Sequence, residues 1–205
     1  MRSSILYFGL TALALAVGSA SGHQQVYYTT LSGPAEFPTN TSPGTGWARA
    51  TVDLDLLTLR VEAEFSGLLG STSASHIHCC TALPGTDPGV MNAGVATITP
   101  SFTAFPLGVQ AGTYDFTYDM SVAGSYNAAF ITANGGSVSG AFGALVAGLD
   151  ANKAYLNIHS TSNIPANNFP GGEIRGFLRL VPEPGTLALA MVGGVALILR
   201  RRRSA

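Results

Sequence analysis

The sequence predicts an all-β domain, arranged as a Greek-key β-sandwich or a partly closed barrel. Three observations lead to this fold class. Short segments rich in β-branched and aromatic residues recur along the middle of the chain, 25 glycines and 11 prolines mark frequent turns, and no long amphipathic helical pattern is present. We expect a signal peptide and a carboxyl-terminal membrane helix to flank this domain.

The first half of the domain carries the clearest strand patterns. We expect strands at 25–31, 47–56, 59–65 and 74–78, with a long loop at 36–46 where prolines and glycines gather. Two runs of alternating polar and apolar residues meet at Leu57-Thr58. This arrangement predicts a β-hairpin with one buried and one solvated face.

The second half is predicted from shorter patterns. A loop rich in Gly and Pro is expected at 81–94, and another at 160–172. Ala141 to Leu149 is predicted to form a short helix, although its glycines weaken the pattern. The remaining segments read as strands, at 95–99, 113–118, 153–159 and 173–180.

Both ends of the chain read as targeting segments. Residues 1–22 combine one positive charge, a short apolar run and small residues, which is typical of a secretory signal peptide; an uncleaved anchor is the alternative. Residues 182–205 hold an apolar stretch that ends in four arginines, which by the positive-inside rule stay in the cytoplasm and leave the domain at 23–181 outside. The residues that define this tail are Pro182, Glu183, Pro184, Arg200, Arg201, Arg202 and Arg203.

The charge of the domain excludes one class of partner. Between His23 and Val181 there are five basic and ten acidic residues, which leaves a formal charge of −5. An acidic surface repels phosphate backbones, so we do not expect nucleic acid to bind.

The candidate ligands gather in one short segment. His76, His78, Cys79 and Cys80 fall within five consecutive residues, and in a strand the two histidines project from the same face. His159 is a third candidate. The three imidazoles could bind copper or zinc and leave a coordination position open, or they could hydrogen-bond loop backbone and hold two strands together. Sequence spacing alone does not establish that the three side chains converge, so we favour the structural role. Copper and zinc are the only candidate cofactors.

The two cysteines are adjacent, so the only intramolecular pair is a vicinal one. A trans peptide separates neighbouring Cα atoms by about 3.8 Å, below the usual range for disulfides, so such a bridge would be strained. Three interpretations stay open, ranked as a vicinal disulfide, metal thiolates and intermolecular cross-links.

Several motifs together resemble the CHRD domain, a module named from chordin. They are Leu31-Ser32-Gly33-Pro34-Ala35-Glu36-Phe37-Pro38, Phe65-Ser66-Gly67-Leu68, His76-Ile77-His78, Asn157-Ile158-His159-Ser160 and Pro170-Gly171-Gly172-Glu173-Ile174-Arg175-Gly176. The tail at 181–205 resembles the PEP-CTERM sorting signal of Gram-negative bacteria. That resemblance implies cleavage by an exosortase-type membrane protease, after signal peptidase has removed the signal peptide, and delivery to the cell surface or extracellular matrix. An ordinary carboxyl-terminal anchor is the alternative.

A weaker resemblance is to copper/zinc superoxide dismutase, an immunoglobulin-like sandwich. It implies copper ligands at His76, His78 and His159, and an anion-guiding arginine at Arg175. His23 is the only other histidine, so the two-metal arrangement of that family cannot be built. Glu173 and Arg175 share strand parity, and we expect them to form a surface ion pair or to bind loop backbone.

The prediction is therefore an exported, surface-directed and non-enzymatic protein. It passes through the inner membrane and acts as a structural or binding component of the envelope or polymer matrix, with matrix polysaccharide or surface proteins as candidate partners. A copper- or zinc-binding redox protein is the alternative. The motifs of serine hydrolases, nucleotide-binding folds and zinc proteases are absent from the sequence.

Overall fold

An eight-stranded antiparallel sheet forms most of the domain in the computed structural model, which describes residues 23–86, 90–161, 169 and 171–182. The predicted signal peptide and the sorting tail lie outside the described residues. The strands are β1 (Gln24–Ser32), β2 (Thr45–Asp53), β3 (Thr58–Ser66), β4 (Ser71–His78), β5 (Gly112–Asp119), β6 (Tyr155–Thr161), β7 (Ile174–Phe177) and β8 (Arg179–Leu180).

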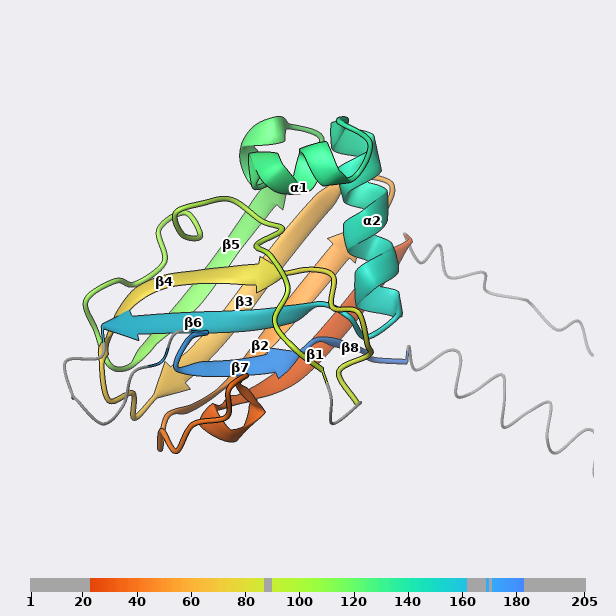
Figure 1. The fold of residues 1–205 in the computed structure, drawn as a ribbon. Helices are drawn as coiled ribbons and strands as arrows, with labels where there is room; N and C mark the ends of the chain where they lie inside the picture. Colours follow the sequence, from red (N-terminus) through yellow and green to blue (C-terminus); the bar gives the residue numbers. More distant parts are fainter. Residues whose placement is uncertain (1–22, 87–89, 162–168, 170, 183–205) are drawn as a thin grey trace, which may run out of the picture.

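The sheet curls into a partly closed barrel, as the sequence predicts. The strand order is β4-β6-β7-β1-β2-β3-β5, and β8 pairs with β1. Figure 1 shows β4, β6 and β7 crossing in front of β1, β2, β3 and β5. The apolar faces of the two groups meet in one core, which contains Tyr27, Val61 and Ile158.

The hairpin predicted around Leu57-Thr58 is confirmed. β2 and β3 pair along their full lengths, from Thr45 with Ser66 to Asp53 with Thr58. Alternation places the apolar residues of both strands in the core and their polar residues on the outer face of the sheet. The hairpin therefore has one buried and one solvated face.

Helices cover one end of the barrel (Figure 1). The predicted helix is present and longer than expected, as α2 (Val138–Asp150), and its Ala141, Leu145 and Leu149 join the core. Ser137 begins it by accepting a hydrogen bond from the Gly140 amide, a standard amino-terminal cap. Three short elements were not predicted from the sequence, namely α1 (Ala128–Ala133) and the two 3-10 turns η1 (Gly33–Ala35) and η2 (Ala123–Ser125).

The strand expected at 95–99 was wrong. This segment makes only two isolated bridges, between Val95 and His78 and between Thr97 and Tyr126. Pro100 follows directly and has no amide hydrogen to continue a ladder. The last expected strand, at 173–180, is divided into β7 and β8.

No helix among the described residues is both long enough and apolar enough to cross a membrane. The apolar stretch of the predicted sorting tail is not among these residues.

Candidate metal centre

Three histidines converge on the outer face of β4 and β6. His76 and His78 alternate with the fully buried Ile77, so both project away from the core. His76 lies opposite Asn157 in the register, which places His159 on the same face two residues further along β6. The ring centroids are 5.7 Å apart for His76 and His78, and 5.5 and 5.8 Å from each of these to His159.

One ligand atom from each histidine lies within 4.8 Å of the other two. A tetrahedral ion with nitrogen ligands at 2.0–2.1 Å needs ligand atoms about 3.3 Å apart. The nitrogens must therefore approach one another by at most about 1.5 Å to reach that spacing.

Backbone carbonyls fix the tautomers of the two buried rings. His76 donates from Nε2 to the Pro100 carbonyl at 2.7 Å, and His78 donates from Nδ1 to the Ala93 carbonyl at 2.9 Å. A carbonyl can only accept, so in the neutral ring the other nitrogen carries a lone pair. Those other nitrogens, His76 Nδ1 and His78 Nε2, are buried and have no hydrogen-bond partner.

The surroundings keep the histidines uncharged. Burial lowers the pKa of His76, and it lowers the pKa of His78 and of His159 to about 4. The neutral form is the one that binds metal, so protons do not compete for these rings near neutral pH.

An aromatic and cationic layer continues beside the cluster. The Tyr155 ring stacks on His78 with centroids 4.8 Å apart, and the guanidinium of Arg175 lies 4.8 Å from the centre of the Tyr155 ring. Arg175 is only 2% exposed; it donates to the Ala35 carbonyl and to Asn92 Oδ1, at 2.5 and 2.6 Å. Of the two expectations for Glu173 and Arg175, the surface ion pair is wrong, because both side chains are buried. Binding to loop backbone is confirmed for both residues.

Glu173 joins three segments of the chain. Its carboxylate accepts hydrogen bonds from the hydroxyls of Ser42 and Ser160 and from the amides of Leu69 and Gly70. Four donors satisfy a fully buried carboxylate, so this glutamate stabilises the loops around it.

Glu36 is a second buried carboxylate, with a different environment. Its Oε1 accepts from Asn157 Nδ2 at 3.0 Å, its Oε2 lies 3.9 Å from Arg175 Nε, and Oε2 has no hydrogen-bond partner. Burial raises the pKa of Glu36 to about 8, against the lowering effect of Arg175. Gly172 is required beside it, because a side chain there would collide with Asn157 and its φ is +126°.

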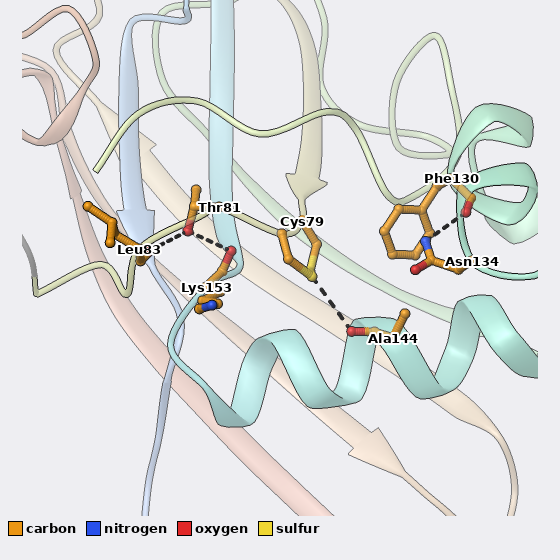
Figure 2. The surroundings of a disulfide bond; sticks show 8 residues. Cys79, Thr81, Leu83, Phe130, Asn134, Ala144 and Lys153 are labelled. Atoms are coloured by element: carbon orange, nitrogen blue, oxygen red, sulfur yellow. Dashed lines mark hydrogen bonds between the residues drawn. A yellow bond between two sulfur atoms is a disulfide. The ribbon is translucent and has the colours of Figure 1, made fainter. Parts of the chain in front are cut away.

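Cys79 and Cys80 form a vicinal disulfide directly after β4. The peptide bond between them is cis, with Cα atoms 2.9 Å apart. Figure 2 shows the sulfur facing α2, where Cys80 Sγ lies 3.6 Å from the Ala144 carbonyl. A disulfide sulfur has no hydrogen to donate, so this is a packing contact. Gly148 allows it, since a Cβ there would lie 2.2 Å from Cys79 Sγ.

Thr81 fixes the chain beyond the disulfide. Its hydroxyl contacts the carbonyls of Leu83 and Lys153, at 2.6 and 3.2 Å, as Figure 2 shows. The segment that leaves the histidine strand is thus held against the start of β6.

The sequence indicated all three histidines but not the groups that orient them. The carbonyls of Ala93 and Pro100 lie in a loop. Every residue has a backbone carbonyl, so the sequence does not indicate which one accepts a hydrogen bond. The parity of Tyr155 with His159 was visible in the alternation of β6 and could have indicated a shared face.

The described residues define an all-β domain that carries a histidine cluster on the outer face of its sheet. A family model described as the CHRD domain matches residues 27–178, and the chain belongs to this family. A model of the PEP-CTERM protein-sorting motif matches residues 180–203. The protein is accordingly exported, sorted to the cell envelope and processed by an exosortase-type protease. No curated protein and no solved structure matches the chain.

Proposed function

We propose that this protein binds one copper or zinc ion at the cell surface, through His76, His78 and His159. The single observation that carries the proposal is that two imidazoles, each with a buried nitrogen that lacks any partner, lie together with a third imidazole in one cluster. A buried acceptor without a hydrogen bond costs about 1–3 kcal/mol, so a function that uses the lone pairs explains why they are left free.

The carbonyl hydrogen bonds serve a metal site as well as a structural one. Histidine ligands commonly donate their second ring N–H to a carbonyl or carboxylate, which fixes the ring orientation and makes the ligand nitrogen more basic. Ala93 and Pro100 provide such acceptors. The structural role that we favoured from the sequence accounts for these bonds, but it leaves the convergence of the three rings unexplained.

The proposed role is binding rather than catalysis. Three imidazoles leave a fourth coordination position for water or for a ligand from another molecule. We infer that the protein acts in the envelope or extracellular matrix of a Gram-negative bacterium, after signal peptidase and the exosortase-type protease have processed it. A redox reaction at a single copper ion is the second candidate, and the imidazole ligand set favours copper as well as zinc.

Metal analysis of the full chain, purified in detergent, tests the proposal. After exposure to Cu²⁺ or Zn²⁺ and gel filtration, we expect about one equivalent of bound metal, as three converging imidazoles imply. His78→Ala and His159→Ala should each abolish binding. His23→Ala is the matched control, because His23 is exposed and pairs with Asp55.

Less than a tenth of an equivalent in the unaltered protein would refute the metal proposal. Equal binding by the His78→Ala and His23→Ala variants would also refute it, since the metal would then be held elsewhere. Circular dichroism of each variant establishes that a loss of binding is not a loss of folding.

A further inference from the structure

A second candidate site lies on the other half of the outer face, away from the histidines. Tyr28 on β1 and Trp47 on β2 stack there, with ring centroids 6.2 Å apart and an angle of 18° between their planes. Tyr28 is 43% exposed, although it is among the largest apolar side chains of the domain. The core does not explain this pair, because the side chains of both residues project to the outside of the sheet.

A hollow lies on each side of the aromatic pair. The larger, about 410 Å³, is bordered by Tyr28 together with Thr30, Ser32 and Arg179. It opens between β1 and β7, since these strands pair only at Ser32 and Arg175, whereas Tyr27 and Tyr28 of β1 pair with β8. The smaller, about 270 Å³, is bordered by Trp47 with Thr45, Glu64 and Ser66.

Together the hollows and the rings form a strip across the strands. It runs from β8 over β1 and β2 to β3, and three strand spacings correspond to about 14 Å. Aromatic faces are flanked along it by hydroxyl groups, a composition that suits a ligand with alternating C–H faces and hydroxyls.

The arginines of β2 and β3 near the rings have carboxylate partners. Arg49 forms a two-point ion pair with Glu62, with both distances 2.6 Å, and Arg60 pairs in the same way with Asp115. Trp47 donates from Nε1 to Glu64. Over β2 and β3 the strip therefore presents no uncompensated positive charge to attract an anionic polymer, and the exposed Arg179 borders the strip at its β8 end.

We propose that this strip binds a neutral polysaccharide, with the Tyr28 and Trp47 rings stacking on the sugar faces and the hydroxyls of Thr30 and Ser32 bonding to the sugar hydroxyls. The site is independent of the metal centre, which lies on β4 and β6. It would attach the exported domain to a polymer outside the cell.

Affinity electrophoresis of the full chain in detergent tests this inference. Native gels contain hydroxyethylcellulose, xylan, dextran or, as a polyanion, alginate, and each run is repeated with EDTA. We expect at least one neutral polymer to retard the protein, with or without EDTA. Trp47→Ala and Tyr28→Ala should each weaken binding about tenfold, the effect of losing one aromatic stacking contact.

Phe37→Ala is the matched control, because Phe37 is an aromatic residue with 40% exposure outside the strip. This variant should migrate like the unaltered protein. The inference is overturned if no neutral polymer retards the chain, if only alginate does, or if the Phe37 variant loses as much affinity as the Trp47 variant. It is also overturned if light scattering shows that Trp47→Ala dissociates a dimer while polymer binding stays unchanged, since the strip would then bind a second copy.

Discussion

The outer face of the sheet has two halves, which differ in how far their polar side chains are covered from solvent. Over β4, β6 and β7 the polar side chains are covered by loops, and His78 and Arg175 are 7% and 2% exposed. Over β1, β2, β3 and β5 most polar side chains lie open, and Arg60 pairs with Asp115 at the surface, where each is about half exposed. The difference shows that strand alternation decides which residues leave the core, whereas the loops decide which of them lose contact with water.

The largest test of this comparison replaces one arginine in each half. Arg175→Ala should lower the free energy of unfolding by about 3–5 kcal/mol, the range for removing a large buried side chain, because hydrogen bonds and ring contacts are lost together. Arg60→Ala should cost at most about 1 kcal/mol, as exposed ion pairs do, because Arg60 and Asp115 are both about half exposed. Urea denaturation measures both, and equal costs would mean that the covered half is no more tightly organised than the open half.

A smaller effect is expected at the carboxylate that joins the covering loops. Glu173→Gln replaces one acceptor oxygen by an NH₂ group that faces existing donors, so it should cost about 1–3 kcal/mol. Glu64→Gln in the open half has water as an alternative partner and should change stability by less than about 0.5 kcal/mol. Thermal unfolding compares the two variants, and a neutral Glu173→Gln change would show that its four hydrogen bonds are dispensable.

A further comparison concerns pH. The pKa of Glu36 is about 8 in the folded protein and near 4.5 when exposed, so between these values the folded state holds one more proton. Stability should therefore be greatest below pH 4.5 as far as this group is concerned, fall as pH rises towards 8, and level off above it. The slope is on the order of 1 kcal/mol per pH unit.

Glu36→Gln should remove the contribution of this group to the slope, because the amide is neutral throughout. Asp119→Asn in the open half is the control, since hydrogen bonds from Ser121 hold the pKa of Asp119 below its ordinary value and its contribution changes only at acid pH. Denaturation at pH 5, 6.5 and 8 distinguishes the variants. An unaltered slope in Glu36→Gln would assign the pH dependence to other groups.

The sequence predicted those parts of the fold that depend on periodicity. The alternation in β2 and β3 located a hairpin and its buried face, and His76-Ile77-His78 placed two imidazoles together. Glu36 was expected in a loop and its burial was missed, because loop packing has no period. Pro100 ended the expected strand at 95–99, but its carbonyl as a histidine partner could not be foreseen. The helix α1 has only six residues, too few for a helical pattern to emerge.

If the histidines bind a metal ion as proposed, the loop that carries Ala93 and Pro100 links that binding to the order of the covered half. These carbonyls hold the imidazoles in their ligand tautomers, so opening of the loop would release the rings, and a bound ion would in turn oppose that opening. At a free metal concentration 100 times the dissociation constant, the ion would stabilise the closed state by about 2.7 kcal/mol. The N–H groups of Ala96 and Phe102 bond to carbonyls of β4. Their amide hydrogen exchange should therefore slow when a metal ion is bound.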